Sequence, residues 1–358
     1  MLKANRLEKV TDNMKKHNVD QILISSPSSI FYLTGKYIDP GERLFVLYIN
    51  IDMKVKLFIN ELFPVGDFTG IDKIVHKDGD DPISALCSFI DAKKTLGIDK
   101  FWPSGFLINL LEKKPAIKIV NSSSIVDEAR MIKDDEEIEL MRKASKANDA
   151  AISDIIKLIP EKHSEIKMCR ILADIYSKYD TPSFSFSPLV EYGENAADPH
   201  HNSDNTMIKD GDCVLIDIGG RTNNYCSDMT RTVFYKEPCD ECKKIYNIVL
   251  EANIKAIDSV KPGIRFCDID AAARNVITKA GYGKYFTHRA GHNIGIDDHE
   301  YPDVGSYNDM IVKGGMIFSI EPGIYLKGKY GVRIEDLVLV TKNGCEVLNK
   351  YPKELKIL

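Results

Sequence analysis

Short apolar runs alternate with helix-spaced apolar positions over roughly the first third of the chain. The runs predict strands at 21–25, 43–50, 54–60, 94–98 and 117–121. Helices are expected at 7–14, from residue 82 and over 103–111. This alternation predicts a small α/β domain over residues 1–124, which ends in a polar linker at 122–124.

The second part of the chain opens with a helix-start signal. Asp134 can cap a helix and Glu137 can reach back to it, after which apolar residues keep a helical face until Pro160. Three more helices are expected, over 163–179, 241–260 and 268–280. Two helices followed by strands occur twice, which predicts two similar halves related by a pseudo-twofold axis. Such halves place one β-hairpin each across a central cleft.

The first of these hairpins carries two aspartates. Asp217 ends an apolar strand, a turn-like Gly-Gly-Arg-Thr-Asn-Asn follows, and Asp228 lies in the returning strand. A turn centred between Thr222 and Asn223 makes the two aspartates directly opposed partners. Opposed residues share a face, with Cβ atoms about 5 Å apart.

The second hairpin carries two glutamates. Glu321 and Glu335 are symmetric about Gly328, which lies in a Lys-Gly-Lys turn. Between the hairpins, His292 adds one nitrogen donor, and its flanking glycines let the backbone approach a metal.

Four carboxylates gathered on one surface repel one another unless a cation lies among them. Two divalent ions about 3.5–4 Å apart would suit four acids and one imidazole. The competing interpretation, solvated acids on amphipathic hairpins, is opposed by the apolar neighbours of Asp217 and Glu321. The sequence therefore predicts a two-metal site with the ligands Asp217, Asp228, His292, Glu321 and Glu335.

These blocks resemble the pita-bread metallopeptidases, the family that holds methionine aminopeptidase, aminopeptidase P and prolidase. The resemblance implies an α+β catalytic domain with pseudo-twofold halves over residues 125–358, preceded by a smaller α/β domain of creatinase or prolidase type. Ser-Ile-Phe-Tyr-Leu-Thr-Gly at 29–35 is similar to a segment of that N-terminal domain, although an aromatic strand ending in a turn glycine would give the same pattern. Methionine aminopeptidases lack this domain, so the segment favours the proline-specific members.

The resemblance also assigns histidines around the substrate. His200, after the strand expected at 186–190, matches a histidine that contacts the substrate, and His201 is the alternative. His299 matches a histidine that hydrogen-bonds the scissile carbonyl. His288 lies four residues before the metal histidine, as in aminopeptidase P and prolidase.

Two neighbours of the predicted ligands need separate comment. Arg333 shares a strand face with Glu335 and is expected to pair with acids or to bind substrate. Asn293 follows the metal histidine where methionine aminopeptidases and many prolidases carry glycine. Ligation is expected to survive this change if the asparagine side chain points away.

The reaction that the resemblance implies is metal-assisted hydrolysis of the peptide bond before proline. Glu321 is expected to carry a proton from the attacking water to the leaving amine, while His299 and His200 stabilise the oxyanion. Oxygen-rich ligation favours Mn²⁺, with Co²⁺ or Zn²⁺ as alternatives. Cleavage of Xaa-Pro dipeptides, as by prolidase, is the first expectation, and removal of one residue from longer peptides, as by aminopeptidase P, stays open.

Composition and charge limit the partners. A chain of 358 residues with 44% hydrophobic content suits two globular domains. The net charge of −5 provides no basic field for nucleic acid or anionic membranes. Because no apolar run has the length of a signal peptide or membrane span, we expect a cytoplasmic protein. A homodimer is expected from the resemblance alone.

Eight cysteines in a chain of this length are too sparse for a disulfide scaffold, so reduced thiols are expected. Cys239 and Cys242 form a single Cys-x-x-Cys at an expected helix start. A structural zinc or redox role for this pair is the alternative to inert thiols.

Two further classes of protein share the scaffold that the resemblance implies. One is a metal-free enzyme resembling creatine amidinohydrolase, and the other is a non-catalytic binding module resembling the peptidase-like domain of a histone chaperone. Both would lack the metal ligands, whereas this chain has all of the expected residues.

Overall fold

A computed structural model describes residues 2–66, 69–199 and 201–358 of the chain. The chain divides into two compact units, Met1–Arg130 and Met131–Leu358. Each unit has its own sheets and its own apolar core.

The described residues form helices and strands with the following bounds. The helices are α1 (Ala4–Lys16), α2 (Pro27–Thr34), α3 (Pro82–Cys87), α4 (Ser104–Lys113), α5 (Ser123–Arg130), α6 (Asp135–Lys157), α7 (Glu165–Ser177), α8 (Asp240–Ser259) and α9 (Phe266–Lys279). The strands of the first unit are β1 (Gln21–Ile24), β2 (Val46–Asn50), β3 (Val55–Asn60), β4 (Asp72–His76), β5 (Leu96–Ile98) and β6 (Ile119–Asn121). The strands of the second unit are β7 (Ser183–Phe184), β8 (Leu189–Tyr192), β9 (Cys213–Ile218), β10 (Gly220–Thr222), β11 (Tyr225–Cys226), β12 (Met229–Phe234), β13 (Gly291–Asn293), β14 (Glu300–Val304), β15 (Ile317–Ile320), β16 (Gly323–Leu326), β17 (Tyr330–Arg333), β18 (Asp336–Val340) and β19 (Cys345–Val347).

The first unit is an α/β layer built on one mixed sheet. Its strand order is β4-β3-β2-β1-β5-β6, with β1, β5 and β6 parallel and β1, β2 and β3 antiparallel. Apolar side chains of the sheet and of α3 and α4 form its core, among them Leu23, Phe58, Leu86 and Leu110. Strand β4 was not predicted, because only one of its five residues is buried and its apolar stretch is short.

In the first unit the structure excludes the strand alternative for residues 29–35 and corrects the expected linker. Residues 29–35 lie in helix α2 and its cap, not in a strand: Ser26 Oγ accepts the N–H of Ser29 at 3.3 Å, and Gly35 ends the helix with φ of 70°. The expected linker at 122–124 instead begins α5, which packs on α1 through Asn13 Nδ2, a donor to the carbonyl of Ile125 at 2.9 Å. The division between the units therefore follows Arg130 rather than residue 124.

The second unit begins with the predicted capping box. Asp134 Oδ1 accepts the N–H of Glu137, and Glu137 Oε2 accepts the N–H of Asp134, both at 3.0 Å. Helix α6 then buries Met141, Ala151 and Ile155 along one face. The sequence signal therefore identified this helix start correctly.

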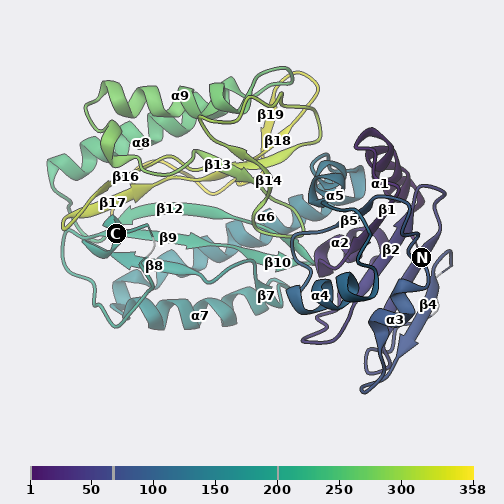
Figure 1. Ribbon diagram of the computed structural model, residues 1–358. Coiled ribbons are helices and arrows are strands. Elements are labelled where there is room, and N and C mark those ends of the chain that lie inside the picture. The colour runs from purple at the N-terminus through teal and green to yellow at the C-terminus, as the bar shows by residue number, and fades with distance from the viewer. Residues whose placement is uncertain (1, 67–68, 200) are drawn as a thin grey trace. The chain divides into compact units, whose positions relative to one another are not determined.

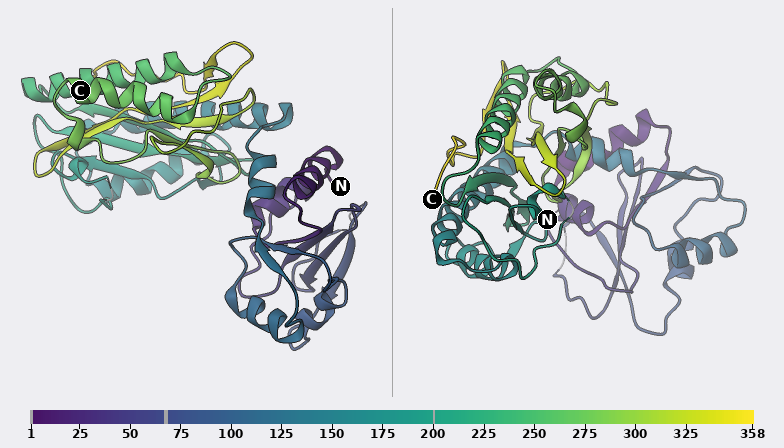
Figure 2. Two further views of the ribbon diagram at one scale, coloured as in Figure 1. Left: turned by 45° about the horizontal axis from the view of Figure 1, so that its top comes forward. Right: turned by 90° about the vertical axis from the view of Figure 1, so that its left-hand side faces the viewer.

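The second unit consists of two similar halves, as predicted. In one half α6 and α7 pack on the sheet β12-β9-β8, and in the other α8 and α9 pack on strands of the sheet β14-β13-β15-β18-β19 (Figure 1). The two helices of each pair also lie side by side in the other views (Figure 2). This layering brings the β9–β12 ribbon of one half next to the β15–β18 ribbon of the other.

Two smaller findings complete the fold. The strand expected at 186–190 lies instead at Leu189–Tyr192, because Pro188 has no N–H to contribute to a ladder. None of the described helices combines the length and the apolar character that a membrane crossing requires.

Candidate metal centre

The register of the first acid pair differs from the prediction. Asn223 and Asn224 have positive φ angles of 50° and 66°, the conformation of a two-residue type I′ turn. The turn is centred between these two asparagines, so Asp217 lies opposite Thr230 and not opposite Asp228. The predicted direct opposition of the aspartates is wrong. Asp228 instead precedes Thr230 by two positions, which makes it a diagonal neighbour of Asp217 on the same face.

The second acid pair has the predicted register. Strands β15 and β18 and strands β16 and β17 pair in one continuous register, which is centred on Gly328. Glu321 and Glu335 lie between these two paired segments and oppose each other across the ribbon. Each ribbon therefore brings two carboxylates to the same region.

His292 presents a lone pair to this region. Its Nδ1 is 3.1 Å from the carbonyl oxygen of Asn293, which can only accept, so the ring proton is on Nδ1. The deprotonated Nε2 lies 3.6 Å from Asp228 Oδ2 and 3.5 Å from Glu321 Oε1. Ligand atoms of His292, Asp228 and Glu335 all lie within 4.8 Å of one another. Two carboxylates and an imidazole lone pair that face one another are an arrangement suited to a cation.

The residue after this histidine does not obstruct the site. Asn293 is fully buried, and its Nδ2 donates to the carbonyl of Pro302 at 2.8 Å. The side chain therefore points away from the imidazole, as the sequence argument required.

Three of the acids each leave one buried oxygen without a hydrogen-bond partner among the described residues: Asp217 Oδ1, Asp228 Oδ1 and Glu335 Oε1. In two of them the protein holds the other oxygen, since Arg333 donates to Asp217 Oδ2 at 2.5 Å and Thr230 donates to Glu335 Oε2 at 2.8 Å. Buried polar atoms are seldom left unpaired. The residues present thus fit divalent metal ions, because acids with an unpaired oxygen surround an imidazole whose Nε2 has no proton.

The electrostatics of the metal-free site point the same way. Burial and the neighbouring carboxylates Glu335 and Asp217 raise the pKa of Asp228 well above its usual range. Burial and Arg333 have opposite effects on Glu321, and its pKa rises to about 7. Burial lowers the pKa of His292. Without a cation the protein would have to protonate these acids, which is the behaviour of a cluster built to hold positive charge.

Hydrogen bonds from Arg333 and its neighbours hold the candidate ligands in position. The guanidinium of Arg333 donates through Nη2 to Asp217, through Nε to Thr230 Oγ1 at 3.1 Å and through Nη1 to Tyr325 Oη at 2.9 Å. Tyr325 in turn donates to His288 Nε2 at 2.8 Å, because His288 Nδ1 donates to a backbone carbonyl. Arg333 is therefore a positioning residue for Asp217 in this structure, and His288 lies at the end of the same chain of hydrogen bonds.

His299 stands at the exposed edge of the centre. Its ring lies on that of His292, with centroids 3.9 Å apart. Arg289 Nη2 donates to His299 Nδ1 at 3.0 Å, which puts the proton of the neutral ring on Nε2. His299 can therefore donate a hydrogen bond outward.

Of the other two histidine candidates, the structure describes only His201, which contacts Glu165. His200 lies outside the described residues. His201 Nε2 is 3.1 Å from Glu165 Oε2, and the other oxygen of that buried carboxylate accepts the N–H of Tyr192 at 2.7 Å. Glu165, His201 and Asp204 form a second cluster of possible ligands, but their hydrogen bonds satisfy Glu165 fully. These contacts therefore hold the 201–204 segment against α7.

Glu191 is a buried acid near the site that sequence reasoning missed. It lies on β8, whose Leu189 pairs with Asp217, so Glu191 and Asp217 share one face of the sheet. Both carboxylate oxygens of Glu191 are buried without a partner among the described residues, and burial raises its pKa to about 8. A glutamate within an otherwise apolar strand was the available signal.

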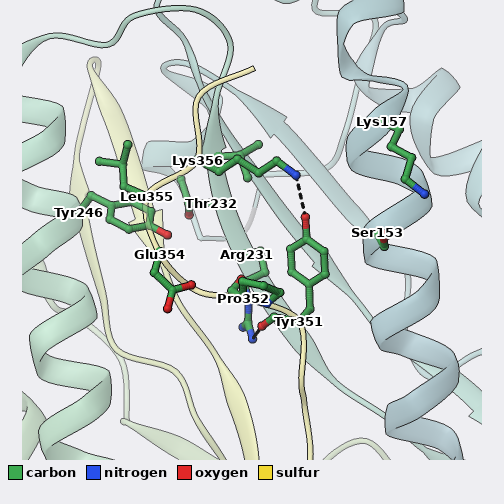
Figure 3. Close-up of a pocket in the computed structure, with 11 residues that line it drawn as sticks. Ser153, Lys157, Arg231, Thr232, Tyr246, Tyr351, Pro352, Glu354, Leu355 and Lys356 are labelled. Carbon is green, nitrogen blue, oxygen red and sulfur yellow. Dashed lines mark hydrogen bonds between the residues drawn. The ribbon is translucent and has the colours of Figure 1, made fainter.

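A pocket of about 350 Å³ lies elsewhere in the second unit (Figure 3). Its basic side chains are engaged within the chain: Lys356 Nζ donates to Tyr351 Oη at 3.1 Å, and Lys157 pairs with Asp154 at 2.9 Å. Arg231, which also lines it, is occupied by backbone carbonyls and a carboxylate. The predicted ligands are not among the residues that line this pocket.

A buried cluster of carboxylates and one imidazole between two β-ribbons defines a hydrolase of the pita-bread class, and comparison with known proteins agrees. Residues 139–342 match metallopeptidase family M24, and residues 6–132 match the creatinase/prolidase N-terminal domain. An uncharacterized peptidase of Staphylococcus aureus (strain MRSA252) is 37% identical over 358 residues, which covers 97% of this chain and 99% of that protein. The chain therefore belongs to metallopeptidase family M24.

Solved structures extend the comparison to the whole fold. A prolidase from Thermococcus sibiricus superposes with a TM-score of 0.95 at 34% identity and covers 100% of both chains. A dipeptidase from Pyrococcus horikoshii OT3 gives a TM-score of 0.92 at 35% identity, covering 99% of this chain and 100% of that chain. The predicted family, fold class and metallopeptidase activity are confirmed.

Proposed function

We propose that this protein is a dinuclear metal-dependent Xaa-Pro dipeptidase. The observation that carries the proposal is that ligand atoms of His292, Asp228 and Glu335 lie within 4.8 Å of one another, while both of these acids keep a buried oxygen without a hydrogen-bond partner among the described residues. Asp217, Asp228, His292, Glu321 and Glu335 would hold two divalent ions. When bound, such ions polarise a scissile carbonyl and lower the pKa of water.

The chain's own groups supply the remaining functions. Glu321 moves a proton between the attacking water and the leaving amine nitrogen, and Ser319 Oγ orients it by donating to Glu321 Oε1 at 3.2 Å. His299, with its proton on Nε2, donates a hydrogen bond to the developing oxyanion. His200 is assigned the second such donor from the resemblance. His288 and Arg333, first expected to bind substrate, keep the hydrogen-bonded frame around the ligands in register.

The preference for proline rests on the relatives. The matched N-terminal domain and the prolidase and dipeptidase among the similar structures support it. A bond before proline has no amide hydrogen, so its recognition differs from that of an ordinary peptide bond.

The substrate class can be tested with purified protein supplied with Mn²⁺. Three substrates are compared: an Ala-Pro dipeptide, an Ala-Pro-Ala tripeptide and an Ala-Ala dipeptide. We expect hydrolysis of Ala-Pro to exceed that of the other two by about tenfold or more. Preference for the tripeptide would assign the protein to aminopeptidase P, and equal turnover of Ala-Ala would refute proline specificity.

The alternatives of another class, a metal-free amidinohydrolase or a binding module, make a different prediction. Both require no stoichiometric transition metal. Elemental analysis after dialysis in Mn²⁺ should give about two ions per chain, and a protein that retains no stoichiometric metal after this dialysis would contradict the proposal. Mn²⁺ as the physiological ion, a cytoplasmic location and a homodimer stay predictions; sedimentation would test the last.

A further inference from the structure

Two cysteines that the hydrolytic site does not use lie together at the start of α8. Cys239 is the N-cap residue of this 20-residue helix, and its Sγ accepts the backbone N–H of Cys242 at 3.3 Å. The two sulfur atoms are 3.1 Å apart. A helix N-terminus stabilises negative charge, so the first of these thiols has the surroundings of a thiolate.

The two thiols differ in exposure and acidity. Cys239 is exposed and Cys242 is buried. Burial opposes ionisation of Cys239, yet hydrogen bonds from Cys242 hold its pKa below the ordinary value. Burial and the thiol of Cys239 raise the pKa of Cys242 to about 12. An accessible thiolate beside a protonated, protected thiol is the division of labour between an attacking and a resolving cysteine.

Two acidic residues, Asp240 and Glu241, lie within the motif, and Asp240 is exposed. Their charges oppose a thiolate, but despite burial the pKa of Cys239 stays below its ordinary value because of the hydrogen bonds from Cys242. Glu241 accepts hydrogen bonds from Tyr330 Oη at 2.6 Å and Lys329 Nζ at 3.2 Å, so its charge is partly compensated. Among the described residues, neither cysteine belongs to a group of three or more potential metal ligands. A closed structural zinc site needs four ligands, which favours redox chemistry over zinc.

We propose that Cys239 and Cys242 form a redox-active dithiol that exchanges reversibly with low-molecular-weight disulfides of the glutathione type. The Cys239 thiolate attacks one sulfur of the small disulfide, forms a mixed disulfide and releases one small thiolate. Cys242 then loses its proton and attacks Cys239 Sγ, which releases the second small thiolate and closes the intrachain disulfide. The protein dithiol is oxidised and the small disulfide is reduced to two thiols.

The test uses the reduced full-length protein, incubated with oxidised glutathione and quenched with an alkylating reagent. Peptide mass spectrometry should find a disulfide between Cys239 and Cys242. In Cys242→Ser the reaction should stop as a glutathione adduct on Cys239. In Cys239→Ser we expect no adduct on Cys242, and this variant should fold because serine is a favourable N-cap.

Cys267 provides the internal comparison. It is a partly exposed thiol whose Sγ is 3.5 Å from Asp309 Oδ1, and burial and that carboxylate raise its pKa. Cys239 should react with the disulfide on the order of tenfold faster than Cys267. Cys242→Ala, which keeps the buried position apolar, should trap the same adduct as Cys242→Ser. Equal labelling of Cys239 and Cys267, or a wild-type protein that retains both thiols of the motif, would overturn the proposal.

Discussion

Glu335 and Asp336 are adjacent in the chain and both are buried, but they occupy two regions of opposite character. Successive side chains of β12 face opposite directions, so Thr230 hydrogen-bonds Glu335 and Arg231 hydrogen-bonds Asp336. On the first side lies the candidate metal centre. On the second lies an ion-paired network that extends to the pocket of Figure 3.

The two carboxylates respond differently to the same degree of burial. Burial opposes ionisation of Asp336, but Arg231 at 2.7 Å and Lys353 at 2.6 Å hold its pKa below the usual value. Burial raises the pKa of Glu335 well above its usual range, and the carboxylates Glu321 and Asp217 raise it further. A fully paired carboxylate stabilises the fold, whereas several buried carboxylates that share one arginine form a site suited to a cation.

The largest effect is expected from removing a ligand on the first side. Asp228→Ala should lower turnover of an Xaa-Pro dipeptide in excess Mn²⁺ by about a thousandfold or more, because a predicted metal ligand would be lost. Elemental analysis should show fewer ions per chain. In chelator, the variant should unfold no more easily than the wild type, since one repelling acid is gone.

The matched control is Cys239→Ala, a change outside both regions. It should leave turnover near the wild-type value. Full activity of Asp228→Ala with metal supplied would refute the ligand assignment.

On the second side the effect should appear in stability. Arg231→Met should reduce the free energy of unfolding by roughly 3–5 kcal/mol, because Asp336 and the carbonyl of Glu335 lose a buried partner. Urea unfolding measures this change. Lys353→Met, at a side chain that is 23% exposed, should cost distinctly less. If the two variants were equally stable, the distinction between the regions would fail.

Glu191 is a buried acid that is neither paired among the described residues nor a predicted ligand. Its effect on stability should therefore depend on pH. Its folded pKa of about 8 exceeds its ordinary value of 4.5, so its contribution favours folding at low pH and is lost as the pH rises through 8. Glu191→Gln should therefore be more stable than the wild type above pH 8, by on the order of 4 kcal/mol. The difference should vanish near pH 4.5. A pH-independent difference between the two proteins would show that Glu191 is paired.

The smallest effect is expected from changing Arg333, whose hydrogen bonds hold the candidate ligands in position. Arg333→Lys keeps the charge but loses the forked contacts to Asp217, Thr230 and Tyr325. Metal affinity should fall by roughly 10–100-fold, with KM nearly unchanged at saturating Mn²⁺. A rise in KM with unchanged metal affinity would restore the substrate-binding role that the sequence suggested.

The sequence determined the inventory of the site. Acid pairs on two hairpins, the histidine among glycines and the recognisable blocks were enough to single out the candidate ligands and the family, because hairpins are local structures. The capping box at Asp134 was likewise readable, since its partners lie within one turn of helix. The secondary structure of residues 29–35 could not be decided from the sequence, because an apolar run of that length suits a strand or a buried helix equally.

Only the tertiary structure decided how these residues meet. The register of the first ribbon depended on which residues of the turn adopt positive φ, and Asn223 and Asn224 moved its centre by one position. The unpaired oxygens, the proton positions on His292 and His299, and the burial of Glu191 arise from contacts between segments far apart in the chain. Residue types fix which charges a chain can offer, but desolvation and partner geometry, which exist only after packing, decide which of those charges need a metal.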